Sequence, residues 1–318
     1  MRKTLHSSQR NDSSDLGFGR VVSEESNLRL INKDGSFNVK RKGLNFFTSL
    51  SIYHSLLTME WWKFIGLASL GYMLLNIFFA FIYLIFEPGA LLGTEAATFL
   101  AKFLRAFFFS VQTSSTIGYG HVFPESISAN FIVALESFVG LLGFAIITGL
   151  LFARFSRPNA KILFSENAII APYRDITAFE FRIANARKNQ IIELQAQLTF
   201  SRMEKAGKHL IRRYYRLDLE RDKVPFFPLT WTIVHPIDDN SPLKDINQTE
   251  LVNSQAEFLI LLTGTDDTFN QTVHSRFSYR GDEIVFNAKF SKIFEYGKDG
   301  HHITVDVGRL SDIEKVEN

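Results

Sequence analysis

The chain has 318 residues, of which 46% are hydrophobic and 32 are phenylalanine, and its formal net charge is +2 at pH 7. Because there is no cysteine, disulfides and thiolate metal sites are excluded. The small net charge argues against a nucleic-acid partner held by bulk electrostatics. The length is enough for about two domains.

Residues 1–43 are polar and rich in serine, asparagine and charge, which predicts a partly disordered cytoplasmic arm. Basic residues are present, but no apolar core follows them until past residue 43, so we expect no cleavable signal peptide. Apolar side chains near the end of the arm can add a short strand to another part of the protein. These are Leu28, Leu30, Ile31, Phe37 and Val39.

Residues 44–62 carry apolar side chains at helical spacing, with serine and threonine between them. The pattern predicts an amphipathic slide helix that lies in the membrane interface and ends at the pair Trp61 and Trp62. The alternative is that this segment only extends the helix that follows.

Two later segments are long and apolar enough to cross a bilayer, residues 64–86 and residues 127–155. The second contains Gly140, Gly143 and Gly149, which permit close helix approach or bending. Basic residues flank the two spans on their outer sides, whereas the loop between the spans carries only two. Both termini are therefore expected in the cytoplasm.

Residues 100–112 are apolar but too short to cross, which predicts a re-entrant pore helix whose C-terminal dipole end points toward a cation. The run Thr116-Ile117-Gly118-Tyr119-Gly120 follows. Potassium filters are built from such a segment, in which backbone carbonyls replace the water shell of the ion. We expect the carbonyls of Thr116, Ile117, Gly118 and Tyr119 to bind K⁺, and no other cofactor.

The two glycines of this run can take the positive φ angles that turn successive carbonyls toward one axis. Because one chain supplies only one wall, a homotetramer is implied. An ordinary glycine-containing turn is the alternative, but the position between two membrane-length segments favours the filter.

Glu136 lies inside the second predicted span. A carboxylate there is costly and usually faces protein or water, so Glu136 is a candidate functional residue. The alternative is a buried structural acid that is hydrogen-bonded behind the filter.

From residue 158 onward, short alternating runs are separated by polar, glycine and proline residues. This alternating pattern predicts a cytoplasmic all-β domain that folds as an immunoglobulin-like sandwich. The predicted division is an arm at 1–43, a slide helix and two-span pore domain at 44–157, and the β-sandwich at 158–318.

Several runs resemble prokaryotic inward-rectifier potassium channels of the KirBac type, over nearly everything after about residue 30. Residues 106–113 leading into 116–120, and residues 149–158 at the end of the second span, match the family. In the β domain the matching runs are 182–187, 235–238, 241–243 and 275–284. The absence of a helix with repeated arginines disfavours voltage sensing.

The resemblance implies that the chain lies in the inner membrane of a prokaryote. It also implies roles for individual residues. Phe152 falls at the aromatic constriction of the inner helix crossing, and Phe144 falls where strong rectifiers carry an acid, which implies only weak block by polyamines or Mg²⁺. Glu193 and Asp267 match acids that line the cytoplasmic pore. The alternatives are a packing or lipid-facing Phe152 and a solvated sheet face for the two acids.

Two departures from the family pattern stand out. Eukaryotic relatives brace the filter with a Glu-Arg pair, whose positions here hold Gln112 and Val122, so Glu136 is expected to take over part of that bracing. Eukaryotic relatives also carry basic residues at the end of the interfacial helix, and Glu60 stands at one of these positions here. Other basic residues near the inner membrane surface remain as contacts for anionic phospholipid or phosphoinositide. These are Arg154, Arg157 and Arg187.

Two other functions were considered. A two-span receptor or transporter subunit would need neither a re-entrant helix nor the filter run. An enzyme built on the β domain would need a nucleophile-base or metal-ligand constellation, and the sequence offers only scattered histidines and the adjacent pair His301 and His302. Catalysis is therefore not expected.

Overall fold

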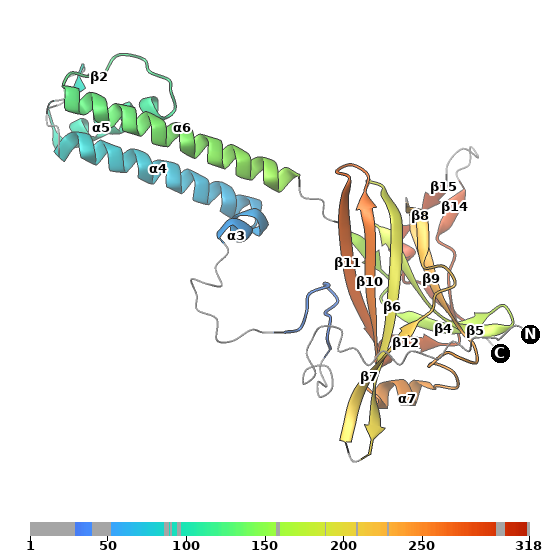
Figure 1. Cartoon of the computed structure of the whole chain (residues 1–318). Coiled ribbons are helices and arrows are strands. Elements are labelled where there is room, and N and C mark those ends of the chain that lie inside the picture. Colours follow the sequence, from blue (N-terminus) through green and yellow to red (C-terminus); the bar gives the residue numbers. More distant parts are fainter. Residues whose placement is uncertain are drawn as a thin grey trace, which may run out of the picture. The chain divides into compact units, whose positions relative to one another are not determined.

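The computed structural model describes residues 29–39, 52–85, 89, 91–93, 97–156, 160–187, 189–207, 209–227, 229–296 and 303–316. The chain divides into two compact units, and each is described by itself (Figure 1). The membrane unit comprises residues 42–157. The β unit comprises residues 158–318 together with the arm at 1–41.

In the described part of the membrane unit, the helices are α3 (Ile52–Thr58), α4 (Trp61–Ile85), α5 (Phe99–Ser114) and α6 (Ile127–Phe155). By length and composition, α4 and α6 qualify as membrane spans, with mean hydropathies of 2.0 and 2.2. Ser126 caps the start of α6 by accepting a hydrogen bond from the Ala129 amide, so this helix begins where a cap is available.

The tryptophan pair lies elsewhere than predicted. Trp61 and Trp62 open α4, whereas the sequence pattern had them end the interfacial helix. Within the described residues, α3 is a separate helix that ends at Thr58, so it does not simply extend α4. The physical reason is a pair of hydrogen bonds from Arg154. They go to the carbonyl of Leu56, in the last turn of α3, and to that of Met59, just after the helix, so neither carbonyl needs a further helical turn as its partner.

The helices α4 and α6 run side by side, and α5 lies at one end of the pair (Figure 1). Phe79 and Tyr83 of α4 pack with Ala106 and Phe109 of α5 in a buried cluster. On either side of α5, the two-residue strands β1 (Leu91–Leu92) and β2 (Phe123–Pro124) pair antiparallel and join the loops that enter and leave it. The sequence pattern did not predict this pairing, because two residues cannot display an alternation.

The β unit contains two five-stranded sheets that pack as a sandwich, in agreement with the predicted class. One sheet has the order β11-β10-β6-β7 with β8 beside β6, and the other has the order β12-β4-β5-β3 with β9 beside β5. The strands of the first are β6 (Ile191–Ala206), β7 (His209–Leu217), β8 (Lys223–Phe227), β10 (Glu257–Asp266) and β11 (Gln271–Arg280). Those of the second are β3 (Ile162–Phe164), β4 (Ala168–Tyr173), β5 (Ile176–Asn185), β9 (Thr230–Ile237) and β12 (Ile284–Phe286).

Smaller elements complete the unit. Two short pairs join β13 (Ala288–Phe290) to β16 (Ile313–Lys315) and β14 (Phe294–Tyr296) to β15 (Ile303–Val305). The helix α7 (Gln248–Asn253) begins with a capping box between Asn247 and Glu250. Aromatic side chains fill the core, where Phe258 stacks on Phe179 at 4.3 Å between ring centroids. Phe200 lies 4.9 Å from the same ring, so residues from both sheets interlock at Phe258.

A buried histidine joins two of the runs that carried the family resemblance. His235 on β9 lies with Nδ1 2.5 Å from the Asp218 carbonyl oxygen and Nε2 2.8 Å from Ser241 Oγ. Burial lowers the pKa of His235, although hydrogen bonding to Asp218 works in the opposite direction. The neutral ring therefore acts as a structural link between β9 and the turn at residues 238–241.

Close packing of α6 on α5 gives a first prediction. A Cβ built on Gly140 would lie 2.8 Å from the Ser114 carbonyl oxygen and 3.0 Å from its Cα. We expect Gly140→Ala to destabilise the membrane unit by about 1–3 kcal/mol, because the two backbones must move apart. Gly71→Ala on α4 is the matched control, since no atom lies within 4 Å of its added Cβ. Equal melting temperatures of the two variants in mild detergent would contradict this close packing.

Candidate functional site

Residues 116–120 follow α5 closely, and their backbone φ angles alternate between positive and negative values. Thr116, Gly118 and Gly120 have φ angles of 60°, 56° and 79°, in the left-handed region. Glycine adopts these angles without strain, whereas Thr116 is a β-branched residue that does so only when its surroundings hold it there. Alternation of this kind turns successive carbonyls toward one side.

The amides of this segment are tied back to the pore helix. The N–H groups of Ile117 and Gly118 lie 2.8 and 3.3 Å from the Gln112 carbonyl oxygen, and the Thr116 N–H donates to the Thr113 carbonyl at 3.1 Å. Because the donors face α5, the carbonyls of the same peptide groups are directed away from it. Gln112, predicted as filter support, contributes its backbone carbonyl to this arrangement.

The side chains of residues 116–120 are exposed in a single chain. Tyr119 is 70% exposed, and Ile117 and Thr116 are exposed as well. The loop therefore has three amides anchored to the pore-helix region, whereas its apolar side chains are uncovered. Neighbouring copies of the same loop would supply what one chain lacks.

Behind the pore helix, Glu136 joins all three long helices of the unit. Its side chain is completely buried. Tyr83 on α4 donates its hydroxyl to Oε2 at 2.6 Å, and the Ser110 hydroxyl on α5 contacts Oε1. The two sequence-based interpretations were a functional residue and a buried structural acid that is hydrogen-bonded behind the filter, and the side chain of Glu136 is indeed buried against protein.

Asn76 extends this polar network toward the filter. Its Oδ1 accepts from the hydroxyls of Ser110 at 3.0 Å and Ser114 at 2.9 Å, and its Nδ2 donates to the Tyr72 carbonyl at 2.7 Å. Ser114 is the last residue of α5, two residues before Thr116. Thus Glu136 is connected to the filter segment through Ser110, Asn76 and Ser114.

Sequence reasoning singled out Glu136, but it missed Tyr83, Ser110 and Ser114. A serine or tyrosine in an apolar helix carries no distinctive signal. What could have found them is the helical spacing, since Ser110 and Ser114 are four residues apart and so share a face of α5.

Near its cytoplasmic end, α6 presents uncovered aromatic side chains. Phe152 is 73% exposed and Phe144 is 72% exposed in the single chain. Such positions are compatible with a pore lining, a subunit contact or lipid, and residue type does not distinguish among these.

Arg154 is engaged by protein groups. Its guanidinium donates to the carbonyls of Leu56 and, at 2.6 Å, Met59, and lies over the rings of Trp61 and Phe64 at 4.7 Å from each centroid. A planar guanidinium suits this pair of carbonyls and rings. The contact fixes α3 and the start of α4 to the end of α6.

The other predicted lipid contacts are less constrained. Arg187 is exposed in the loop between β5 and β6, where its backbone N–H donates to Asn185 Oδ1 at 3.0 Å. Arg157 lies outside the described residues, as do His301 and His302. Within the described ranges, no group of three or more His, Asp or Glu side chains is placed to hold a metal ion.

The two predicted pore acids lie at the same end of one sheet. Glu193, at a bulge in β6 with φ 54°, forms an ion pair with Lys223 of β8. Asp267 is exposed in the β10–β11 turn, and its N–H donates to the Gln190 carbonyl at 3.1 Å. The acid that organises this turn is its buried neighbour Asp266, which sequence reasoning missed; it accepts from the Thr268 and Phe269 amides.

The hydroxyl of Tyr83 allows a test of the Glu136 network. We expect Tyr83→Phe to destabilise the membrane unit by about 1 kcal/mol, because Glu136 Oε2 loses a buried donor. Tyr72→Phe on the same helix is the matched control, since that hydroxyl lies 3.5 Å from its acceptor, the Val111 carbonyl. Thermal unfolding in detergent measures both, and an equal effect of the two substitutions would contradict the network's role.

Comparisons with known proteins cover most of both units. A family model described as the inward rectifier potassium channel transmembrane domain matches residues 31–158, and one described as the inward rectifier potassium channel C-terminal domain matches residues 162–318. Inward rectifier potassium channel Kirbac3.1 of Paramagnetospirillum magnetotacticum is 39% identical over 90% of this chain and 95% of its own length.

Two animal relatives are more distant. ATP-sensitive inward rectifier potassium channel 12 of Bos taurus is 26% identical over 94% of this chain and 75% of that protein. Inward rectifier potassium channel irk-1 of Caenorhabditis elegans is 26% identical over 96% of this chain, which spans 60% of its length. All three are ion channels rather than enzymes, in keeping with the expectation that this chain has no catalytic role. The family models match the part of the chain that holds the two apolar spans and the filter backbone, and the part that folds as the cytoplasmic β-sandwich. The chain therefore belongs to the inward rectifier potassium channel family.

Proposed function

We propose that four copies of the chain assemble around the filter and conduct K⁺ passively across the membrane. The carbonyls of Thr116, Ile117, Gly118 and Tyr119 line the path and replace the hydration shell of the ion. The observation that carries this proposal is the combination of left-handed φ angles at alternate residues with amides tied to the pore helix. That combination leaves the carbonyls free for an ion, and the exposed wall of one chain is closed by its neighbours.

The gate in this proposal is a ring of Phe152 side chains at the inner helix crossing. Four apolar rings close a narrow pore by excluding water. The high exposure of Phe152 in one chain supports a role outside the subunit's own core. Phe144 offers no charge to a polyamine or Mg²⁺, so block at its level is weak.

The cytoplasmic acids concentrate cations only modestly in this scheme. Glu193 is ion-paired with Lys223, so part of its charge is compensated, whereas Asp267 stands exposed in its turn. Rings of acids raise the local concentration of cations in proportion to their uncompensated charge. We therefore expect mild inward rectification.

In this proposal, an anionic phospholipid or a phosphoinositide acts where Arg154 contacts the end of α3 and the start of α4, a place that we call the α3–α4 corner. A lipid phosphate would compete with the Leu56 and Met59 carbonyls for the guanidinium of Arg154. Arg157 and Arg187 are further basic contacts. Because Phe152 lies two residues before Arg154, a change at this corner reaches the gate along α6.

Ion flux tests the filter directly. Purified protein in liposomes is expected to pass Rb⁺ and K⁺ and largely to exclude Na⁺, and to migrate as a tetramer in mild detergent. Gly118→Ala should abolish selective flux, because a Cβ opposes a φ of 56°. Gly71→Ala is the control, because that glycine sits in open space on α4. A monomeric protein, or one that passes Na⁺ as well as K⁺, would overturn the proposal.

The lipid proposal is tested at Arg154. Arg154→Lys keeps the charge but cannot reproduce the planar fork that holds two carbonyls, whereas Arg154→Gln removes the charge. If lipid competes with α3 for the guanidinium, both variants should shift the dose-response of Rb⁺ flux to phosphoinositide. The exposed Lys63→Gln, paired with Glu60 at 3.3 Å, serves as control. A wild-type dose-response in inserted, tetrameric Arg154→Gln protein would leave Arg154 with a purely structural role.

A further inference from the structure

The end of the cytoplasmic arm docks on the first sheet of the β unit. The expected short strand takes the form of an antiparallel bridge between Ile31 and Phe37, with Leu28 outside the described residues. Leu30 and Ile31 are buried in a cluster that includes Leu259 of β10. The end of the arm is thus part of the folded β unit.

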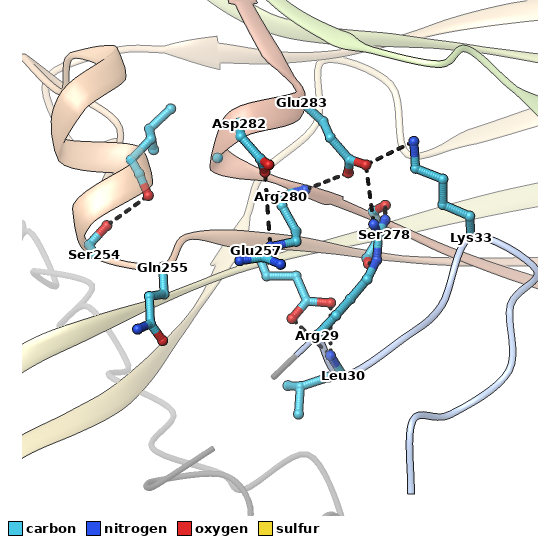
Figure 2. A network of polar contacts seen from close by, with 12 residues as sticks. Arg29, Leu30, Lys33, Ser254, Gln255, Glu257, Ser278, Arg280, Asp282 and Glu283 are labelled. Carbon is cyan, nitrogen blue, oxygen red and sulfur yellow. Dashed lines mark hydrogen bonds and ion pairs between the residues drawn. The ribbon is translucent and has the colours of Figure 1, made fainter. Parts of the chain in front are cut away.

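The acids that receive the arm are supplied with hydrogen-bond donors. Glu257 of β10 is only 2% exposed, and the Leu30 N–H lies 3.1 and 3.0 Å from its two oxygens (Figure 2). Glu283 accepts from Arg29 at 3.2 Å and forms an ion pair with Lys33 at 2.8 Å (Figure 2). A buried or half-buried carboxylate is stable in a protein when it is compensated in this way.

A glutamate of the second sheet differs from these two acids. Glu180 lies on β5, where its neighbours Phe179 and Phe181 are completely buried in the core. Because side chains alternate along a strand, Glu180 points to the opposite, outer face of the sheet, where it is half-buried. Among the described residues, its carboxylate makes no hydrogen bond or ion pair and interacts with other charges only at longer range.

The nearest candidate partner of Glu180 is held by other groups. Arg182 lies two residues further along β5, on the same face of the sheet. Its guanidinium donates to the Ser291 carbonyl at 2.7 Å and to Thr232 Oγ1 at 3.3 Å, and it lies 4.7 Å from the centroid of the Phe290 ring. The guanidinium is therefore directed away from Glu180, and the carboxylate is left without a cation at bonding distance.

Glu180 lines a hollow of about 320 Å³ on this outer face. Val234, which also lines it, is the residue opposite Glu180 in the β5–β9 pair, and Trp231 lies on the same strand. The Glu220 N–H donates to the Val234 carbonyl at 2.9 Å, which brings the loop between β7 and β8 to the hollow. A volume of this size is at the lower end of the range for small-molecule sites.

The second acid of the hollow is already compensated. Glu220 accepts from the Tyr173 hydroxyl at 2.6 Å and from the Arg174 guanidinium at 2.7 Å. Arg221 also lines the hollow and is exposed. The lining residues therefore combine an uncompensated carboxylate, that of Glu180, with the apolar surfaces of Trp231 and Val234.

We propose that this hollow binds a small organic cation whose primary ammonium group pairs with Glu180 and whose apolar body lies against Trp231 and Val234. An ammonium group supplies three donors to a carboxylate that has none, and charge-assisted hydrogen bonds of this kind are the strong ones. The Trp231 ring adds cation–π attraction. A metal ion fits less well, because within the described ranges no group of three or more His, Asp or Glu side chains gathers to hold one. The proposal is independent of ion conduction.

Tryptophan fluorescence of the full-length protein measures this binding, because Trp231 is the tryptophan of the β unit and the others are Trp61 and Trp62. The probe is 2-phenylethylammonium, and its neutral counterpart is 2-phenylethanol. We expect a saturable fluorescence change with the cation only, and its loss in Trp231→Phe. Glu180→Gln should weaken the apparent affinity roughly 10-fold, because a charged acceptor becomes a neutral one.

Arg221→Gln is the matched control, because it removes a charge from the same hollow and should not weaken binding of the cation. The anion 3-phenylpropanoate tests the opposite assignment. Tighter binding of this anion than of the cation, lost in Arg221→Gln, would assign the hollow to an anionic ligand and overturn the proposal. So would equal affinities of the wild-type protein and Glu180→Gln, an equal response to 2-phenylethanol, or the absence of a saturable response.

The pH dependence of the same signal tests the pairing with Glu180. Burial raises the pKa of Glu180; the charges of Arg182 and Lys289 oppose this in part, and that of Glu220 adds to it. An ammonium group pairs with the ionised carboxylate, so the affinity for the probe should fall as the pH is lowered from about 8 to about 5. Glu180→Gln cannot ionise and should not show this fall. The same pH dependence in both proteins would contradict the proposed pairing.

Discussion

The hydrogen bonds that converge on Glu136 hold the membrane unit in the shape that the filter requires. One carboxyl group joins α6 to Tyr83 on α4 and to Ser110 on the pore helix. In an apolar surrounding with no water to compete, a buried polar group of this kind is stable only when its partners are in place. The position of α5 is thereby set, and the filter amides that bond to its last carbonyls are set with it.

Backbone groups also take part in contacts that connect distant segments of this chain. The filter amides bond to a pore-helix carbonyl, Arg154 binds one carbonyl in α3 and one just after it, and Glu257 binds two amides of the arm. Backbone donors and acceptors are obligatory, so these contacts satisfy groups that would otherwise need water. They also explain why single charged residues connect segments far apart in the sequence.

Much of the fold could be predicted because its signals are local. α6 has the predicted bounds, since Ser126 caps a long apolar run, and β3 begins and ends where its three apolar residues do. β11 was not predicted, because Val273, Phe277 and Tyr279 do not alternate regularly, and its pairing with β10 is a tertiary effect. The break between α3 and α4 depends on Arg154, almost 100 residues away, and no local pattern could reveal it.

The filter was predicted from five residues, but its support was only partly predictable. Glu136 attracted notice because a carboxylate in a membrane span is rare, whereas Ser110, Ser114 and Tyr83 are ordinary in apolar helices. The same limit applies to Glu257. In the sequence it is only another acid in a β-strand, and its hydrogen bonds to the Leu30 amide become evident only in the folded structure.

The most direct measurement of the central claim, that residues 116–120 bind K⁺ between subunits, is the melting temperature of the purified protein in KCl and in NaCl of equal ionic strength. A ligand that binds only the folded state raises its stability with concentration. The account predicts that the melting temperature rises with K⁺ and not with Na⁺, and that Gly118→Ala abolishes the difference. Equal melting temperatures of the wild-type protein in the two salts would contradict it.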